Sequence, residues 1–280
     1  MHQIVAISML APGIKRFEIQ AGAIAAKAKP GQFVIVKNGE TGERIPLTIA
    51  GADIGRGTLT IIFQEVGRST LELGLLREGE FISDVVGPLG KPTEIRRYGR
   101  VACVGGGVGA APLLPITRAL YRSGNEVDTI VGARSRDYLI LIDEMKAISH
   151  TATFVTDDGS SGEKGQVTDP LGRWLQEGRR FDLVVAIGPL PMMRAVSDLT
   201  KPYGIPTLVS LNPIMLDGTG MCGACRVSVG DETRFACIDG PEFDGHRVDW
   251  DLAIQRAALF REEEAAARKL FKSRGECRCR

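Results

Sequence analysis

The sequence predicts a β-barrel domain, an α/β domain built on a parallel sheet, and a small cysteine-rich module at the C-terminal end. Short runs rich in Val, Ile, Thr and Phe, separated by Gly, Pro and Asp, fill residues 1–97, which is typical of a small barrel or sandwich. Strand-like and helix-like segments alternate over 98–212, and such alternation indicates parallel βαβ units. Residues 213–280 begin with a loop rich in cysteine and glycine and continue into a helical segment.

The composition is that of an ordinary soluble globular protein. The 280 residues are 44% hydrophobic and 25% charged, with a formal net charge of +1, and this length accommodates two domains. A net charge so close to zero argues against a nucleic acid or a membrane surface as the partner. No apolar run reaches the ~18 residues of a membrane span. The N-terminal stretch also lacks the basic region of a signal peptide, so we expect a cytoplasmic protein.

In the barrel segment, runs of β-forming residues alternate with turn residues. A short helix is expected to begin at Ser69, because Ser69 and Glu72 have the spacing of a capping box. The expected strands lie at 15–21, 32–38, 46–50 and 57–66.

The α/β segment opens with a buried strand, Arg100–Val104, which runs into a glycine-rich loop and an apolar helix. Near the C-terminal end a helix is expected over 249–273, with Leu252, Leu259 and Phe260 among its apolar positions. The further strands are expected at 126–134, 151–159, 181–189 and 206–212, and the further helices at 170–178 and 192–204.

The loop after the first strand of the α/β segment reads GGGVGAAP and opens a helix. Glycines at such a place let the backbone approach a pyrophosphate, whose charge is favoured by the helix N-terminus. The alternative is a tight strand–helix turn that binds nothing. The loop departs from the Rossmann fingerprint, because Pro112 replaces its last glycine and Arg134 and Arg136 stand where an acidic residue would follow the next strand. The candidate nucleotide-binding residues are Gly105, Gly106, Gly107, Gly109, Ala110, Pro112, Gly188 and Pro189.

Two stretches of the barrel segment contain residue types that bind phosphate. In RIPLTI, Arg44 precedes a strand that carries Thr48, and in EVGRST, Gly67 is followed by Ser69 and Thr70 at a helix start. Each stretch has a plainer interpretation, since Arg44 can be a solvated surface charge and Ser69 a helix cap. Their combination with the glycine loop favours phosphate binding.

Three cysteines lie in a glycine-rich loop with the spacing Cys-x2-Cys-x11-Cys, at Cys222, Cys225 and Cys237. This spacing is that of the later part of a plant-type ferredoxin pattern, whose first cysteine would stand where this chain has Asp217. A zinc site also takes cysteine and aspartate, and a purely structural cysteine cluster is a third interpretation.

The remaining cysteines carry less weight. Cys103 lies in a predicted buried strand and is expected to be a small core residue. Cys277 and Cys279 lie in the basic C-terminal tail, where an inert exposed pair and a redox-active pair are both open interpretations.

Together these motifs resemble the ferredoxin–NADP reductase superfamily. The order is a β-barrel with R-x-P-x-T and G-x-S-T, followed by GGGxGxAP and a cysteine module. The cysteine module and the stretch TDDGSSGEKGQVTD resemble the branch that contains the electron-transfer subunit of dihydroorotate dehydrogenase. The stretch LDGTGMCGACR is similar to the small-subunit family of NADH-dependent reduced ferredoxin:NADP oxidoreductases, the sulfide dehydrogenase beta subunit type.

The resemblance implies an oxidoreductase subunit that moves electrons between NAD(H), FAD and a 2Fe–2S cluster. Its partner would be a larger flavin and iron–sulfur subunit, with which it forms an electron-bifurcating hetero-oligomer. The alternative is the electron-transfer subunit of dihydroorotate dehydrogenase. No catalytic acid, base or nucleophile is expected, because hydride passes directly between two cofactors. The residues that the resemblance assigns to the flavin are Arg44, Pro46, Leu47, Thr48, Gly67, Ser69 and Thr70.

The same resemblance favours iron and sulfur over zinc, because a flavin reductase supplies electrons to a cluster. It implies Asp217 as the fourth ligand beside Cys222, Cys225 and Cys237. A carboxylate carries the same single negative charge as a thiolate, although its oxygen is a harder ligand.

Residues at the end of the third α/β strand bear on the choice of nucleotide. Asp157 and Asp158 follow TATFVT, and a carboxylate there repels a 2′-phosphate and can bond a free 2′-hydroxyl. Arg134 and Arg136 are the counterweight if they line the same pocket. We therefore expect NADH to be preferred over NADPH.

Overall fold

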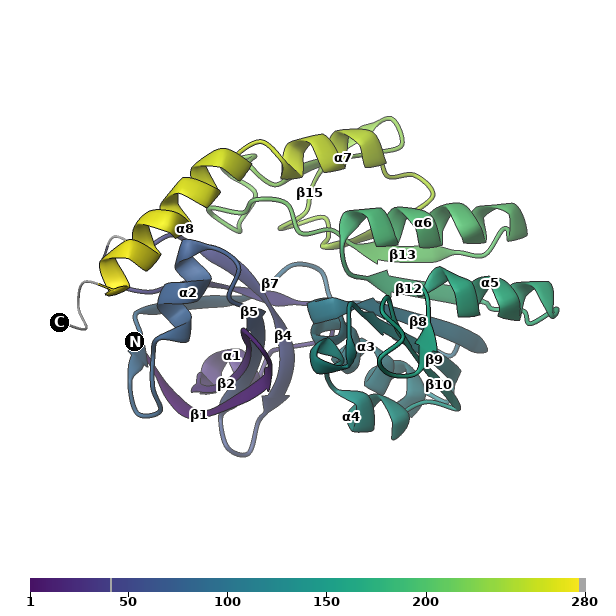
Figure 1. The fold of residues 1–280 in the computed structure, drawn as a ribbon, viewed down its shortest axis with the longest axis horizontal. Helices are drawn as coiled ribbons and strands as arrows, with labels where there is room; N and C mark the ends of the chain where they lie inside the picture. The colour runs from purple at the N-terminus through teal and green to yellow at the C-terminus, as the bar shows by residue number, and fades with distance from the viewer. Residues whose placement is uncertain (41, 277–280) are drawn as a thin grey trace.

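The structure, a computed structural model, describes residues 1–40 and 42–276. A barrel lies on one side, an α/β layer on the other, and the C-terminal segment runs over both (Figure 1). The strands are His2–Ala11 (β1), Ile14–Gln20 (β2), Phe33–Lys37 (β3), Ile45–Asp53 (β4), Thr58–Gln64 (β5), Phe81–Ile82 (β6), Asp84–Leu89 (β7), Arg100–Gly106 (β8), Glu126–Ala133 (β9), Thr151–Thr156 (β10), Glu163–Lys164 (β11), Leu183–Ile187 (β12), Thr207–Ser210 (β13), Arg226–Val229 (β14), Glu232–Phe235 (β15) and Glu242–Asp244 (β16). The α-helices are Gly22–Ala25 (α1), Arg68–Gly74 (α2), Ala110–Arg122 (α3), Ile142–Lys146 (α4), Thr168–Gln176 (α5), Leu190–Thr200 (α6), Trp250–Ala257 (α7) and Arg261–Glu276 (α8).

The first domain is an antiparallel sheet of seven strands in the order β6-β1-β2-β5-β4-β3-β7. The two end strands, β6 and β7, are separated along the chain by Ser83 alone, so the sheet curls into a near-closed barrel. Its interior is filled by alternating apolar side chains, among them Phe17 and Phe63, whose rings meet edge to face at 5.0 Å. The predicted barrel is confirmed, although β1, β6 and β7 were not foreseen as strands.

The second domain is a seven-stranded sheet in the order β11-β10-β9-β8-β12-β13-β16. The strands from β8 to β13 are parallel, as the alternation of strands and helices predicted. The edge strand β16 is antiparallel to β13 and comes from the C-terminal segment. Helices α3 and α4 pack on one face of the sheet and α5 and α6 on the other.

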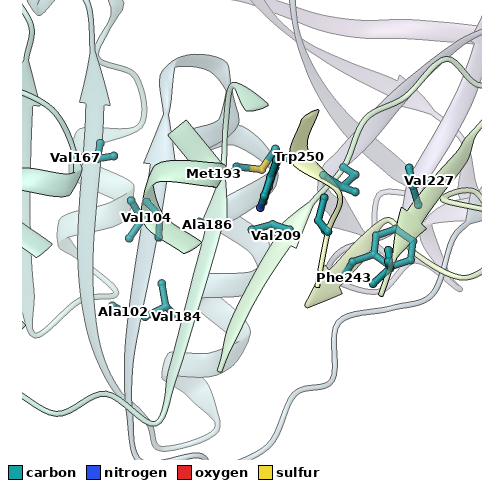
Figure 2. Packing of buried hydrophobic residues seen from close by; sticks show 14 of the residues in the cluster. Ala102, Val104, Val167, Val184, Ala186, Met193, Val209, Val227, Phe243 and Trp250 are labelled. Atoms are coloured by element: carbon teal, nitrogen blue, oxygen red, sulfur yellow. The ribbon is translucent and has the colours of Figure 1, made fainter. Parts of the chain in front are cut away.

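Continuous apolar cores join the parts. Ala11, Ile14 and Ile62 of the barrel belong to the same buried cluster as Leu113 of α3 and Ile140. On the other face, Figure 2 shows Val104, Ala186 and Val209 of the sheet in line with Met193 and with Val227, Phe243 and Trp250 of the C-terminal segment. The cysteine module therefore rests on the same core as the parallel sheet.

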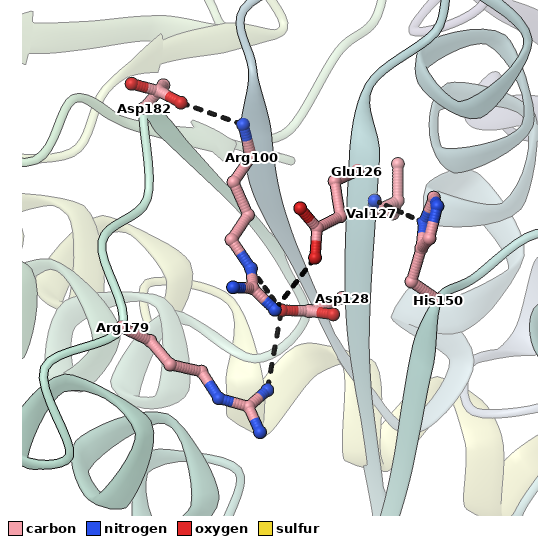
Figure 3. A network of polar contacts seen from close by, with 7 residues as sticks. All are labelled: Arg100, Glu126, Val127, Asp128, His150, Arg179 and Asp182. Atoms are coloured by element: carbon pink, nitrogen blue, oxygen red, sulfur yellow. Dashed lines mark hydrogen bonds and ion pairs between the residues drawn. The ribbon is translucent and has the colours of Figure 1, made fainter.

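A polar network closes the amino-terminal edge of the parallel sheet (Figure 3). The fully buried Asp128 carboxylate lies 2.9 Å from Arg100 Nε and 3.6 Å from Arg179 Nη1. Asp182 accepts a hydrogen bond from the backbone N–H of Arg100 at 2.8 Å. The network thus lies at the edge opposite the carboxyl ends of the strands, where open α/β sheets bind their ligands.

The predicted helix over 249–273 is two helices, α7 and α8, separated by 258–260. Asp249 caps α7 by accepting a hydrogen bond from the Leu252 N–H at 3.0 Å. The chain turns after α7 because α7 packs on the cysteine module, whereas α8 lies against α2 (Figure 1). Leu259 and Phe260, expected on an apolar face, are 56% and 51% exposed at this turn. Cys277 and Cys279 lie outside the described residues.

Across residues 1–40 and 42–276, none of the helices combines the length and the apolar character that crossing a membrane requires.

Candidate functional site

The glycine loop lies at the carboxyl edge of the parallel sheet, where β8 ends and α3 begins. Gly106 and Gly109 are needed for packing, because a Cβ on Gly109 would overlap the Ile187 carbonyl oxygen and one on Gly106 would overlap the Met192 thioether. Gly107 differs, since its φ is +56° and nothing lies within 4 Å of the position of a Cβ. The tight-turn interpretation therefore explains two of these glycines, and Gly107 faces open space.

The structure brings the two predicted nucleotide stretches together. A Cβ placed on Gly188 would lie 3.1 Å from the Gly106 Cα, and one placed on Gly106 would lie 3.1 Å from Pro189 Cδ. Gly105 packs beneath them against Ala110, the first residue of α3. Pro112 stands in the first turn of α3, where a helix has N–H groups without intrahelical partners. The loops after β8 and β12 thus form one backbone cradle beside a helix N-terminus, which suits a pyrophosphate.

The backbone of Asp157 and Asp158 is paired with the end of β9, next to Arg134 in the chain. The N–H of Asp157 bonds the Ala133 carbonyl at 3.1 Å, and that of Asp158 bonds the Arg134 carbonyl at 3.3 Å. The Asp158 carboxylate accepts two hydrogen bonds from Ser160, from its hydroxyl at 2.6 Å and its N–H at 2.9 Å. These bonds, that of the hydroxyl first, hold the pKa of Asp158 below its usual value. The Arg134 guanidinium lies over the Tyr138 ring, 4.8 Å from its centroid.

In the barrel, the flavin candidates lie on β4 and at the start of α2. Pro46, Leu47 and Thr48 are half-buried residues of β4. The capping-box prediction at Ser69 is wrong, because the N-cap of α2 is Gly67 and the Thr70 hydroxyl accepts its N–H at 3.1 Å. Threonine takes this role because it occupies the third helical position, from which a side chain reaches back to the N-cap.

Ser69 is turned toward a neighbouring carboxylate instead. Its hydroxyl donates to Glu43 Oε2 at 2.6 Å, and the two residues line a hollow with Ile45 and Glu72. A phosphate in this hollow would be opposed by the carboxylates of Glu43 and Glu72 and favoured by the N–H groups at the start of α2. Arg44 itself is exposed, as the plainer interpretation held.

Arg44 also reaches the cysteine module. Its Nη2 donates to the backbone carbonyl of Asp217 at 3.4 Å. The next residue, Gly218, is buried with φ +84°, and a Cβ there would lie 2.8 Å from Leu89 Cδ1 and 3.0 Å from Ile35 Cγ1. The cysteine loop is therefore seated on the barrel at the arginine that the sequence assigned to the flavin.

Within the loop, the described residues assemble the predicted ligands in part. Cys225 and Cys237 are buried, and their sulfurs are 3.2 Å apart, whereas Cys222 is exposed. The Asp217 carboxylate accepts hydrogen bonds from the Thr219 hydroxyl at 2.7 Å and from the Met221 N–H at 3.0 Å. Over residues 1–40 and 42–276, no three or more His, Cys, Asp or Glu side chains are grouped as a metal site.

The chemistry of the loop nevertheless suits an iron–sulfur cluster. A hydrogen bond from the backbone N–H of Ala224 is the main reason that the pKa of the Cys222 thiol lies below its usual value. The lowered pKa favours the thiolate, which is the form that iron binds. Burial raises the pKa of Cys237 to about 12, so the charge of a bound metal is needed to ionise it. Gly218, Gly220 and Gly223 all have positive φ, which lets this loop wrap tightly.

Burial also raises the pKa of Cys103 to about 12, and this side chain is fully buried, so the prediction of a core residue is confirmed. Sequence reasoning missed two residues beside the candidate sites. Met192 lies against Gly106 and Gly188. The sequence feature that could have identified it is its position one helical turn after the Gly188–Pro189 pair. Arg256 of α7 donates from Nη2 to the Ala224 carbonyl at 3.1 Å, and no spacing in the sequence links residues so far apart.

Comparison with known proteins places these features in a family. Residues 103–198 match the oxidoreductase NAD-binding domain, and residues 212–249 match the iron–sulfur cluster binding domain of dihydroorotate dehydrogenase B. The chain is 48% identical to a dihydroorotate dehydrogenase B (NAD(+)) electron transfer subunit homolog of Thermotoga maritima over 99% of this chain and 98% of that protein. It is 32% identical to the electron transfer subunit of Desulforamulus reducens over 89% and 97% of the two chains.

Solved structures agree. One chain from a structure described as giving insights into flavin-based electron bifurcation by the NADH-dependent reduced ferredoxin-NADP oxidoreductase superposes with a TM-score of 0.92. It is 47% identical, and the match covers 97% of this chain and 98% of that one. Phthalate dioxygenase reductase, 17% identical with a TM-score of 0.56 over 82% and 86% of the two chains, shares the fold.

The barrel, the nucleotide-type sheet and the cysteine module define an iron–sulfur flavoprotein reductase with the ferredoxin–NADP reductase fold, and so a redox enzyme subunit. Within this class, the chain belongs to the family of the electron transfer subunit of dihydroorotate dehydrogenase B and its homologues. Membership of this family confirms the expected cofactors, which are FAD, an iron–sulfur cluster and NAD(H).

Proposed function

We propose that this chain is the small subunit of an electron-bifurcating NADH-dependent reduced ferredoxin:NADP oxidoreductase. The support is the 47% identity and the TM-score of 0.92 to a chain from a structure of that enzyme. The observation that supports an electron path between the two sites is a hydrogen bond. It joins Arg44, a flavin candidate, to the carbonyl of Asp217, a cluster candidate. A larger flavin and iron–sulfur subunit would be the partner that exchanges electrons with it.

Each of the three predicted segments binds one cofactor. Residues 1–97 hold FAD, 98–212 hold NAD(H), and 213–280 hold a 2Fe–2S cluster, with β16 of the last segment completing the sheet of the second. When bound, these groups supply hydride transfer and one-electron transfer, and the chain supplies position and charge. No side chain is assigned to proton transfer or covalent chemistry.

At the flavin, Arg44 would neutralise phosphate charge, and Gly67, Ser69 and Thr70 would present the start of α2 to it. Pro46, Leu47 and Thr48 would follow the flavin along β4, since this strand carries them beside Arg44. At the cluster, Asp217 would be the fourth ligand beside the cysteines. Binding would require the Asp217 carboxylate to exchange hydrogen bonds with Thr219 or Met221 for the metal.

At the nucleotide, Gly105–Pro112 with Gly188 and Pro189 would hold the pyrophosphate. Asp157 is the first candidate for the 2′-hydroxyl of NADH, because the Asp158 carboxylate is already bonded to Ser160. A carboxylate beside a 2′-phosphate repels it, and since both aspartates are exposed the repulsion is partly screened by water and salt, so we expect NADPH to be disfavoured by about 30-fold. Arg134, held over Tyr138, would offset part of this repulsion.

The second candidate is the electron-transfer subunit of a dihydroorotate dehydrogenase. The names of several relatives favour it. Asp217, which stands where the ferredoxin pattern has a cysteine, favours the first candidate instead.

Anaerobic purification followed by titration with NADH tests the proposal. About two irons and two sulfides per chain are expected, and NADH should bleach the flavin and then produce the paramagnetic signal of a reduced cluster. NADPH should act more weakly by about 30-fold or more. Stoichiometric zinc without iron would overturn the cluster assignment. The activity of the native complex, purified with its partner, decides between the two candidate functions. Only the bifurcating oxidoreductase reduces NADP with reduced ferredoxin, and only the dihydroorotate dehydrogenase oxidises dihydroorotate.

A further inference from the structure

Guanidinium groups from separate elements hold the backbone of the cysteine loop. Arg44, before β4, donates to the Asp217 carbonyl at 3.4 Å, and Arg226 of β14 donates to the Gly223 carbonyl at 3.3 Å. Arg256 of α7 donates to the Ala224 carbonyl at 3.1 Å. The loop between Asp217 and Cys225 is thus tied at both ends by positively charged side chains.

Arg256 differs from Arg226 in its surroundings. Arg226 is exposed, whereas Arg256 is half-buried and its Nε is fully buried with no hydrogen-bond partner in the described part of the chain. No described carboxylate lies within ion-pair distance of Arg256. A partly buried positive charge without a described carboxylate partner is stabilised by an anion placed near it.

The element that carries Arg256 is firmly placed. Trp250, at the start of α7, is buried and donates from Nε1 to the Gly245 carbonyl at 3.0 Å. The N–H of Asp249 bonds the Ser228 carbonyl of β14 at 3.0 Å. An arginine in the last turn of a helix interacts favourably with the helix dipole. The Arg256 side chain instead points away from its own helix and donates to a carbonyl 32 residues away in sequence.

We propose that Arg256 is a positioning residue for the iron–sulfur cluster, holding the Ala224 carbonyl by its hydrogen bond and placing a positive charge beside the segment that joins Cys222 to Cys225. This inference rests on the cluster ligands of the proposed function. Four anionic ligands and two sulfides leave a 2Fe–2S cluster negative, and its reduction adds a further negative charge. A nearby guanidinium therefore stabilises the reduced state more than the oxidised state and raises the reduction potential.

The test compares the parent with Arg256→Gln, Arg256→Lys and Arg226→Gln in a redox titration of the cluster monitored by electron paramagnetic resonance. Arg226→Gln is the matched control, because it removes an equal charge and a carbonyl contact one residue away. Arg256→Gln should lower the equilibrium constant for cluster reduction about tenfold, which is about 59 mV for one electron. Arg226→Gln should change it by less than about twofold, since an exposed charge is screened, and Arg256→Lys should retain most of the parent value.

An unchanged potential in Arg256→Gln, or equal shifts in the two glutamine variants, would overturn the inference. Iron content and circular dichroism cover the case in which Arg256→Gln holds no cluster. Loss of iron from Arg256→Gln alone, with the fold intact and iron retained in Arg256→Lys, supports a positioning role. Loss from both glutamine variants contradicts it, because the loop would then be fragile in general. Metal analysis of the parent protein comes before the analysis of any variant. Zinc without iron in the parent would contradict the proposed function itself.

Discussion

The glycine loop of the α/β domain and the cysteine loop of the C-terminal module are both glycine-rich, yet they are held in different ways. Gly106 and Gly109 have helical or extended φ values and are tightly surrounded by the β12–α6 connection. Gly218, Gly220 and Gly223 have positive φ, and Cys222 between them is exposed. The first loop is fixed by the core of the parallel sheet. The second is fixed by backbone N–H groups that donate to the Asp217 carboxylate and by arginines that donate to backbone carbonyls.

The contrast indicates which of the two sites is formed before its ligand binds. A loop buried against a sheet keeps its shape without a ligand, because moving it would open a cavity in a close-packed core. A loop tied by polar contacts at the surface competes with water for each of them, so each bond contributes only about 1 kcal/mol. We expect the nucleotide cradle to be preformed and the cluster site to be completed by its own metal.

The largest effect is expected from adding one methyl group to the buried loop. Gly109→Ala places a Cβ on the Ile187 carbonyl, and because backbone cannot yield as a side chain can, it should cost about 3 kcal/mol of unfolding free energy. Urea unfolding measures this, and NADH binding should weaken with it. Gly107→Ala is the control, since its cost is limited to about 1–2 kcal/mol for a positive φ. Equal costs at the two positions would mean that packing does not fix this loop.

A smaller effect is expected from Glu242 on β16, the strand that joins the cysteine module to the parallel sheet. Thr93 donates to its Oε1 at 2.7 Å, and burial raises the pKa of Glu242 to about 7. A raised pKa means that the folded protein binds the proton more tightly. Its stabilising contribution is therefore complete below the unfolded pKa of about 4.5 and is lost as the pH rises through about 7. For this half-buried group the loss should be about 2 kcal/mol.

Urea unfolding of Glu242→Gln between about pH 5 and pH 8 tests this, since the amide does not ionise and its stability should be flat over that range. Asp244→Asn on the same strand is the matched control, because Asp244 is exposed. If the parent and Glu242→Gln decline in parallel, the ionisation of Glu242 does not govern the junction.

The smallest effect is expected in the cysteine loop. Gly218→Ala meets the Leu89 and Ile35 side chains rather than backbone, and these can shift, so the cost should be about 1–2 kcal/mol and come mainly from the positive φ. Iron content should fall while NADH affinity stays at the parent value. A loss of NADH affinity equal to that of Gly109→Ala would show that the two loops are not independent.

Much of the architecture could be predicted because local patterns carry it. The strand alternation around Phe17 and Phe63 and the alternation of strands with helices after residue 98 require only hydrophobic periodicity. The break between α7 and α8 could not be predicted, because no Gly or Pro marks 258–260 and the chain turns there in order to pack on two different parts. The cap of α2 also escaped, since Ser69 and Thr70 are equally plausible and tertiary contact with Glu43 takes the serine away.

The residue types at the sites can be taken from the sequence alone: the glycines at 105–109, the Cys-x2-Cys-x11-Cys spacing and the aspartate at 217. How these residues meet depends on the tertiary structure. It placed Gly188 on Gly106, the Asp158 N–H on the Arg134 carbonyl, Arg44 on the cysteine loop and Arg256 on the Ala224 carbonyl. Motifs are local because a turn or a ligand spacing is set by neighbouring residues, whereas the contacts that tune a cofactor cross between elements and depend on how the whole core packs.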